Sequence, residues 1–159
     1  MQKRFLTREQ ALQKLRHYCG YQERSHADAV QKLWDLGVGK KMHDEILSVL
    51  IEEDYINEER FAKAFARGKF RMNDWGRKKI VHALKEKKVS DYNIRKAMKE
   101  IDESDYKNRL AVLLEKKHET MKNDQFLVRK KKLMDYLLQK GFEHELISSA
   151  INKMEGHDK

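Results

Sequence analysis

The 159-residue sequence contains no proline and a single cysteine, Cys19. Proline is the strongest helix breaker, and the chain is rich in the helix-favouring residues Ala, Leu, Lys, Glu and Arg. We therefore expect an all-α protein. One cysteine excludes an intramolecular disulfide and fits a reducing compartment. The start, MQKRFLTREQ, lacks the apolar run of a signal peptide, and no segment approaches membrane-spanning length. We therefore expect a soluble, cytoplasmic protein without a membrane partner.

Motifs for catalysis and cofactor binding are also missing. The sequence has no G-x-x-x-x-G-K-[ST], no G-x-G-x-x-G and no H-E-x-x-H. His43, Asp44 and Glu45 resemble a metal-binding corner, but adjacent side chains on a helix point about 100° apart, so we interpret them as solvated surface. His17 near Cys19 could indicate an activated thiol, yet we favour a small core residue for Cys19. We expect no enzymatic activity, no cofactor and no metal.

Capping residues and apolar periodicity predict nine helices. Thr7 and Gln10 form a capping-box pattern, and other helix starts and ends carry residues typical of caps. The predicted N-caps after Thr7 are Ser25, Asn57 and Ser90, and the predicted closing glycines are Gly37 and Gly141.

The nine predicted helices fall into three similar groups. The middle helix of each group ends in a related phrase, LWDLGV, LKEKKV or LLQKGF, and the equivalent leucines Leu33, Leu84 and Leu137 lie 51 and 53 positions apart. A spacing near fifty with the same helix content is typical of tandem repeats that stack on their neighbours. We expect three tandem three-helix (helix-turn-helix-like) repeats that form an elongated, curved rod. The predicted division is a leader 1–6, repeats 7–56, 57–102 and 103–154, and a polar tail 155–159.

Positive charge is concentrated in the middle of the chain. The formal net charge is +9, but Arg60 to Lys99 holds fourteen Lys or Arg and three acids. The preceding residues 44–59 hold seven acids and no Lys or Arg. An excess of this size favours an anionic partner surface over internal pairing, although charge runs on helices are more often solvated faces.

Residues 57–88 combine an apolar and a cationic helix face. Helical spacing predicts that Phe61, Ala64, Phe65 and Gly68 are buried on one face. A second face of the same helix carries Arg60, Lys63, Arg67 and Arg71. The next helix repeats the arrangement, with Ile80, Ala83 and Leu84 inward and Lys78 and Lys85 on another side.

Three aromatic residues could serve as stacking platforms for nucleic-acid bases. They are Trp34, Trp75 and Tyr92. Aromatic residues at helical spacing are more often core, and we favour core for Trp34. For Trp75, beside the cations 77–79, both interpretations stay open.

The phrases YINEERFAKAFARGKFR (55–71) and WGRKKIVHALKEKKV (75–89) resemble the central motif of the RecX family. YCGYQERS (18–25) and LLQKGFEHELI (137–147) resemble the segments before its second helix and at its end, so the resemblance covers about residues 7–154. The family often has Gly-Pro where this chain has Gly76 and Arg77, and a glycine where it has Lys88. The resemblance implies three tandem three-helix repeats without a catalytic group.

The same resemblance implies a regulator of the RecA recombinase. RecX-like proteins lie in the groove of the RecA filament on single-stranded DNA, and they usually inhibit filament growth, ATP hydrolysis and strand exchange in recombination, DNA repair and the SOS response. We expect a monomer with the RecA nucleoprotein filament as partner, and direct contact with single- or double-stranded DNA stays open. The residues expected to face the filament or DNA are Arg60, Lys63, Arg67, Lys69, Arg71, Arg77, Lys78, Lys79 and Lys85, and in the third repeat Lys130, Lys131 and Lys132.

Two other classes of function remain. Three-helix units with a turn resemble helix-turn-helix modules, so the chain could be a DNA-binding protein that acts without RecA. Against this, the basic residues are spread over at least two helices, whereas a recognition helix gathers them at its start. The third class is a scaffold whose charge serves solubility alone.

Overall fold

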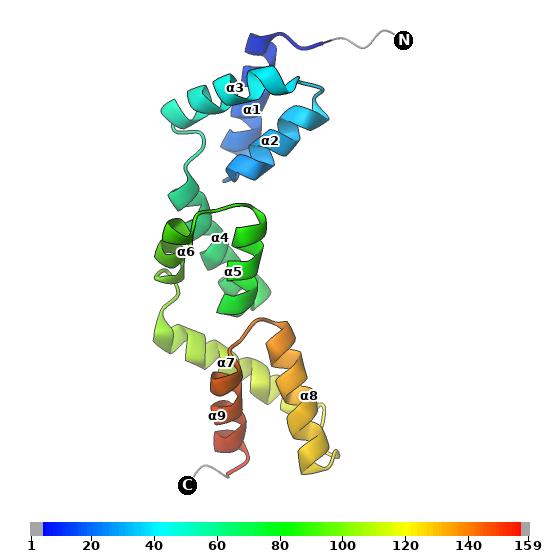
Figure 1. Cartoon of the computed structure of the whole chain (residues 1–159). Coiled ribbons are helices and arrows are strands. Elements are labelled where there is room, and N and C mark those ends of the chain that lie inside the picture. Colours follow the sequence, from blue (N-terminus) through cyan, green and yellow to red (C-terminus); the bar gives the residue numbers. More distant parts are fainter. Residues whose placement is uncertain (1–4, 157–159) are drawn as a thin grey trace. The chain divides into compact units, whose positions relative to one another are not determined.

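The computed structural model describes residues 5–156, which form nine α-helices and no strand (Figure 1). The all-α prediction is confirmed. Parts of the predicted leader and tail, residues 1–4 and 157–159, lie outside the described residues. The helices are α1 Arg8–Tyr21, α2 His26–Asp35, α3 Lys40–Glu52, α4 Glu58–Asn73, α5 Arg77–Glu86, α6 Asp91–Met98, α7 Glu103–Glu119, α8 Phe126–Gln139 and α9 His144–Met154.

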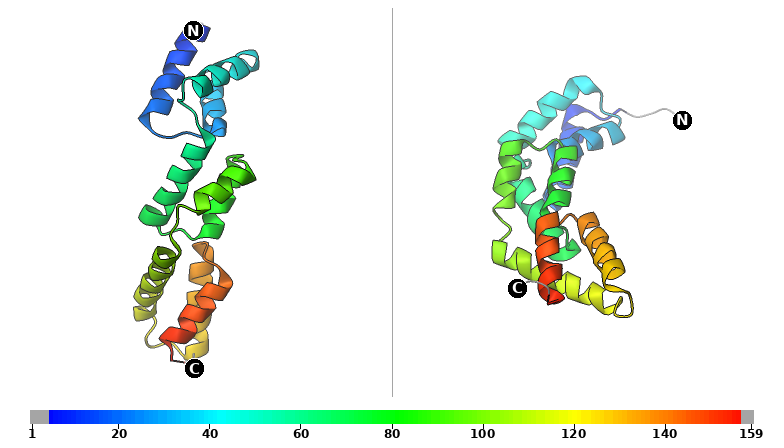
Figure 2. Two further views of the ribbon diagram at one scale, coloured as in Figure 1. Left: turned by 90° about the vertical axis from the view of Figure 1, so that its left-hand side faces the viewer. Right: turned by 60° about the horizontal axis from the view of Figure 1, so that its bottom comes forward.

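The chain divides into two compact units, and helices α4 and α5 each contribute to both. The first unit holds the described residues up to 64 together with 84–97, and the second holds 65–83 together with the described residues from 98. Helices α1, α2 and α3 pack on one another in the first unit, and α7, α8 and α9 do so in the second (Figure 2). The predicted repeat boundaries and the curved rod stay predictions.

The predicted helix caps of the first unit are present. Thr7 accepts a hydrogen bond from the Gln10 backbone at 3.1 Å and Gln10 returns one, which is the predicted capping box. Ser25 forms the same arrangement with Asp28. Gly37 ends α2 with a φ of +77°, a conformation in which glycine is favoured because it has no Cβ. Local sequence signals therefore set where these helices begin and end.

The core of the first unit combines apolar residues of α1, α2 and α3. Leu15, Leu33, Ile46 and Leu50 are fully buried. Cys19 is buried among them, as predicted, and burial raises the pKa of its thiol to about 11. A buried thiol with a raised pKa carries little thiolate at neutral pH, so Cys19 is a core residue rather than an activated nucleophile.

Two predictions for the first unit are wrong. His43 is buried rather than solvated, because its Nε2 lies 2.8 Å from the carbonyl oxygen of Val38 in the turn before α3. Trp34 is 51% exposed rather than core, and it covers His43 edge-on with the two ring centroids 4.6 Å apart. An imidazole that reaches a turn carbonyl needs an apolar cover, and the indole supplies it from the surface.

The buried face of α4 differs from the predicted one. Phe61 is buried as predicted, but the remaining buried residues are Ala62, Ala66 and Phe70, whereas Ala64, Phe65 and Gly68 are half-buried. In the second unit Phe70 packs against the Tyr106 ring at a centroid distance of 5.8 Å. Phe65 instead meets the edge of Trp75 at 6.4 Å. A stripe chosen by apolarity alone included Gly68 and omitted Phe70, which has the larger surface to bury.

The start of α5 is held against the turn between α8 and α9 inside the second unit. The Gly76 backbone N–H donates to the Lys140 carbonyl at 2.7 Å, and that of Lys78 donates to Gly141 at 2.9 Å. A Cβ on Gly76 would lie 2.3 Å from the Gly141 carbonyl carbon. The close approach of these two backbones therefore requires glycine at position 76.

None of the helices within residues 5–156 is long and apolar enough to span a membrane. That same part of the chain holds no group of three or more His, Cys, Asp or Glu residues that could bind a metal ion.

Candidate functional site

The cationic residues expected from the sequence are divided between the two units. Arg60, Lys63 and Lys85 belong to the first unit. Arg67, Lys69, Arg71, Arg77, Lys78, Lys79 and the run Lys130, Lys131, Lys132 belong to the second. The first helix to carry them, α4, begins with a cap from Asn57, whose Oδ1 accepts from the Arg60 backbone at 3.0 Å. The second unit therefore holds the larger set.

Several of these cations are neutralised by carboxylates within their own unit. Arg60 donates from Nε to Glu23 at 2.8 Å, and this hydrogen bond raises the pKa of the guanidinium above its usual value. Lys63 lies 3.7 Å from Glu59. These pairs are structural contacts, because binding an external anion would first have to compete with the internal carboxylate.

Arg67 and the outer lysines of α8 are paired in the same way. Arg67 donates to Glu100 at 3.1 Å. In α8, Lys131 pairs with Asp135 and Lys132 with Asp124, each at 3.0 Å. Pairing therefore accounts for more of the central charge than we expected from the sequence.

Arg77 acts as a clamp at the start of α5. Its guanidinium lies 3.9 Å from the centre of the Tyr106 ring and pairs with Glu143 at 3.1 Å and with Glu103. The Tyr106 hydroxyl donates to Glu143 and accepts from the Arg77 backbone N–H at 3.0 Å. Burial, and then the bond to Glu143, raises the pKa of Tyr106 well above its usual value. This network fixes the fold of the second unit and leaves Arg77 little freedom to bind a partner.

Trp75 and two lysines form an aromatic-cationic site in the second unit. The Lys69 and Lys79 ammonium groups lie 4.8 Å and 4.6 Å from the centre of the half-buried indole. The turn that presents Trp75 is closed by a hydrogen bond of 3.1 Å from its backbone N–H to the Lys69 carbonyl. Cation–π contacts hold both lysines without neutralising them, so the pair can still attract an anion.

Besides Lys69 and Lys79, four of the expected cations make no ion pair within 4 Å among the residues that the structure describes. Arg71 and Lys78 are exposed and lie in the second unit, at the end of α4 and the start of α5. Lys85 is exposed in the first unit, and Lys130 is half-buried in α8. Since they have no internal carboxylate to give up, these four are the best candidates for contacting an anionic partner.

Arg71 also lines a groove of about 530 Å³ in the second unit. The groove includes Asn108 and Arg109 of α7, which the sequence patterns did not indicate. Arg109 is held by Asp74 at 2.9 Å, and Asp74 itself has a φ of +58° at the turn after α4. Arg109 and Asp74 are 35 positions apart in the sequence, so no local pattern predicted this contact.

The fold and surface define an all-helical three-helix-repeat protein whose described residues offer unpaired cations rather than a catalytic constellation. Two family models match the chain: "RecX, second three-helix domain" at residues 57–98 and "RecX, third three-helix domain" at 103–151. The chain belongs to the RecX family, as the resemblance in the sequence indicated.

Curated relatives and solved structures agree with this assignment. Regulatory protein RecX of Bacillus cytotoxicus is 28% identical over 137 residues, covering 86% of this chain and 51% of the relative. Regulatory protein RecX of Oceanobacillus iheyensis is 27% identical over 139 residues, covering 87% and 51%. The chain therefore spans about half the length of the curated relatives it matches. A crystal structure of RecX from Lactobacillus salivarius aligns with a TM-score of 0.83 at 24% identity, covering 93% of this chain and 96% of that one. A second, of regulatory protein RecX, aligns with a TM-score of 0.81 at 22% identity, covering 92% and 71%. At these identities the two structures show a shared fold.

Proposed function

We propose that this chain regulates the RecA recombinase by binding in the groove of the filament that RecA forms on single-stranded DNA. Family membership and the likeness of residues 55–71 and 75–89 to the central RecX motif support this proposal. We propose that binding inhibits filament growth, ATP hydrolysis and strand exchange, and that the chain acts as a cytoplasmic monomer in recombination and DNA repair. Several small contacts along the groove would add up to high avidity without a single strong site.

The surface feature that best supports this proposal is the pair of exposed cations Arg71 and Lys78, which form no ion pair among the described residues. Both lie in the second unit, together with Trp75 and its two lysines. A cation without an internal partner binds acidic RecA surface or DNA phosphate without breaking an existing ion pair. Arg67 was also expected to face the filament, but its pairing with Glu100 makes it a less informative position to change.

The test is ATP hydrolysis by the cognate RecA on single-stranded DNA while the chain is titrated. The variant is R71E/K78E. Its matched control is K107E/K116E, which makes a similar charge change at two exposed lysines of α7 that form no ion pair among the described residues. We expect the wild type and the control to lower the rate at well below one chain per RecA. R71E/K78E should need at least about tenfold more protein for the same effect, which corresponds to binding that is weaker by about 1.4 kcal/mol.

Each other result has a definite meaning. Equal inhibition by R71E/K78E and by the wild type would contradict the assignment of these two residues. If the wild type changed neither the rate nor the filament length, regulation of RecA would be refuted. Salt-dependent DNA binding by the free chain that R71E/K78E weakens would in that case favour the helix-turn-helix-like DNA-binding protein.

A further inference from the structure

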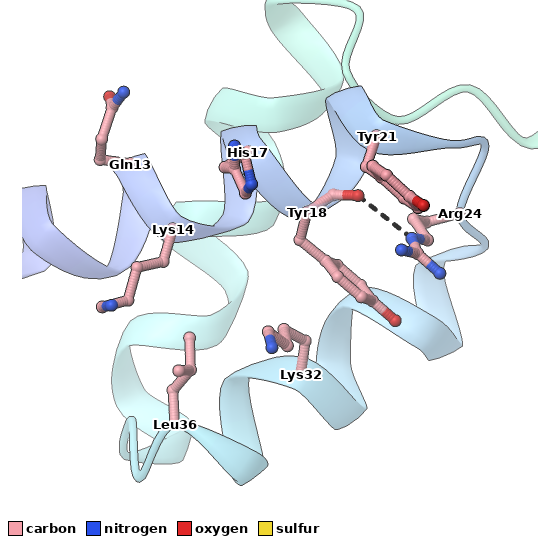
Figure 3. A pocket seen from close by; sticks show the side chains of 8 residues that line it. All are labelled: Gln13, Lys14, His17, Tyr18, Tyr21, Arg24, Lys32 and Leu36. Carbon is pink, nitrogen blue, oxygen red and sulfur yellow. Dashed lines mark hydrogen bonds between the residues drawn. The ribbon is translucent and has the colours of Figure 1, made fainter.

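A cationic pocket between α1 and α2 in the first unit lies outside the site described above (Figure 3). Its volume is about 520 Å³, within the range of small-ligand sites. Lys14 and His17 line it from α1, Arg24 from the following turn and Lys32 from α2, and Leu36 adds an apolar surface. Among the described residues, none that lines this pocket is acidic.

The nearby carboxylates are committed to other partners. Glu23 accepts from Arg60 at 2.8 Å, and Asp28 accepts from Lys87 at 2.7 Å. Asp35 accepts from Gln31 at 2.9 Å. Glu23 and Asp28 are therefore neutralised by cations outside the pocket, whereas Asp35 keeps its charge because Gln31 is neutral. None of the three carboxylates lies within 4 Å of a pocket cation among the described residues.

Two tyrosines stand beside these cations. Tyr18 projects from α1 towards α2, and the Arg24 guanidinium lies 3.8 Å from the centre of its ring (Figure 3). The Arg24 Nε also donates to the Tyr18 carbonyl at 3.1 Å, so the guanidinium is held in place beside the ring, and Arg24 forms no ion pair within 4 Å in the described part of the chain. Tyr21 is 78% exposed. An aromatic ring in water gains from a stacking partner, because stacking removes its apolar face from solvent.

We propose that this pocket binds single-stranded nucleic acid, with a base stacked on Tyr21 and phosphates at Lys14, Arg24 and Lys32. Aromatic platforms combined with cations that follow a backbone are the features that bind single strands independently of their sequence. The pocket is an open groove whose cations come from two helices and the turn between them. Cations spread in this way suit an extended nucleic-acid strand better than a single bound phosphate group. This site is independent of the proposed action on RecA and of the residues tested for it.

The test measures anisotropy of a fluorescein-labelled oligothymidylate of about 15 nucleotides, without RecA. The charge variant is K14E/K32E, and its control is K40E/K41E, an equal charge change at exposed lysines of α3 that form no ion pair in the described part of the chain. We expect K14E/K32E to bind at least about tenfold more weakly, with a salt dependence reduced by about 0.7 for each phosphate that the variant no longer binds. The control should change affinity by less than about threefold.

A second pair of variants tests the aromatic contact. Tyr21→Ala should weaken binding about fivefold or more and leave the salt dependence unchanged, because stacking involves no phosphate. Phe5→Ala is the control, since Phe5 is also an exposed aromatic residue, at 81%, in the first unit. Circular dichroism checks that all variants keep their helices.

Three outcomes would overturn the proposal. They are no binding of the oligonucleotide by the wild type, equal weakening in K14E/K32E and K40E/K41E, and unchanged binding by Tyr21→Ala. If a labelled polyglutamate bound the wild type and bound K14E/K32E more weakly while oligonucleotide binding did not change, the pocket would be a site for an acidic protein segment instead. None of these results depends on RecA, so they leave the proposed function to its own experiment.

Discussion

Lys88, at a position where the RecX family often has glycine, adopts a backbone φ of +62° just after α5. The turn is closed by hydrogen bonds from the Lys88 N–H to the Lys85 carbonyl at 2.9 Å and from the Val89 N–H to the Leu84 carbonyl at 3.1 Å. A side chain in this left-handed conformation brings Cβ too close to the following carbonyl oxygen, at a cost of about 1–2 kcal/mol. The lysine is therefore tolerated by the turn rather than favoured by it.

We predict that Lys88→Gly raises the free energy of unfolding by about 1 kcal/mol, because relief of the strained backbone exceeds the added freedom of glycine in the unfolded chain. Urea unfolding followed by circular dichroism measures it. Lys85→Gly is the matched control, since the same substitution inside α5 should lower stability by about 1 kcal/mol. Equal destabilisation by both variants would show that the backbone at position 88 is not strained.

At the scale of single residues, the helix-capping residues could be predicted from the sequence, whereas the burial of individual side chains could not. Thr7, Ser25 and Asn57 each accept from a backbone N–H three residues further on, so their signals are local. The burial of His43 and the exposure of Trp34 depend on where the turn at Val38 places a carbonyl. A periodic pattern holds no information on that position.

At the scale of elements, the second unit depends on the approach of the turn before α5 to the turn before α9. Gly76 is buried, and the Cβ of an alanine at this position would lie 2.3 Å from the carbonyl carbon of Gly141. This atom belongs to the backbone, so it cannot move aside as the end of a flexible side chain can. The hydrogen bonds from Gly76 to Lys140 and from Lys78 to Gly141 join the same two turns. Position 76 therefore tolerates no side chain, whereas Gly68 inside α4 has nothing within 4 Å of its would-be Cβ.

We predict opposite effects for the same substitution at these two glycines. Gly76→Ala should lower the free energy of unfolding by about 3 kcal/mol, because the overlap forces the two turns apart. Gly68→Ala should raise it by about 1 kcal/mol, since alanine favours the helix interior. Urea unfolding of both variants is the measurement. A Gly76→Ala protein as stable as the wild type would mean that the turns do not touch as described.

The face of α4 shows how far element packing could be predicted. The spacing of apolar residues correctly predicted the helix and the burial of Phe61. Beyond Phe61, however, the buried face runs through Ala66 and Phe70, whereas the predicted residues Phe65 and Gly68 are half-buried. The choice was made by partners distant in sequence, since Phe70 meets Tyr106 and Phe65 meets Trp75. Helical periodicity limits a buried face to a few options, and tertiary packing selects among them.

At the scale of the whole molecule, hydrogen-bonded side-chain pairs recur at one sequence spacing. Arg16 bonds to Glu53, Lys96 to Glu59 and His118 to Glu155, each pair separated by 37 positions and each joining the first and third helices of a three-helix group or their caps. The repeat was visible in the sequence from its apolar phrases. These pairs were not, and of the three only Lys96–Glu59 takes up a cation of the central basic region, where Arg60 and Arg67 are also paired, with Glu23 and Glu100.

The paired carboxylates make stability depend on acid pH. Hydrogen bonds from Arg16, Lys96 and Arg129 hold the pKa values of Glu53, Glu59 and Glu155 below the usual value of 4.5. Burial opposes this effect at Asp28 and Glu58, but hydrogen bonds from Lys87 and Asn93, among others, outweigh it and their pKa values are also lowered. A carboxyl with a lower pKa in the folded state stabilises the fold above its unfolded pKa and loses that contribution as pH falls through the folded value.

We therefore predict that the melting temperature is steady from about pH 7 to 5 and falls below about pH 4.5, where these carboxyls take up protons in the unfolded chain first. Circular dichroism melts at constant ionic strength measure it. Glu155→Gln should melt at a lower temperature at pH 7 and show a shallower acid fall, because it removes a carboxylate bound at 2.8 Å by Arg129. Glu115→Gln, at an exposed carboxyl of α7 without an ion pair in residues 5–156, should change neither. Both changes remove one negative charge, but only Glu155→Gln breaks an ion pair. If Glu115→Gln reduced the fall in melting temperature at acid pH as much as Glu155→Gln, general charge repulsion rather than the ion pairs would set the pH dependence.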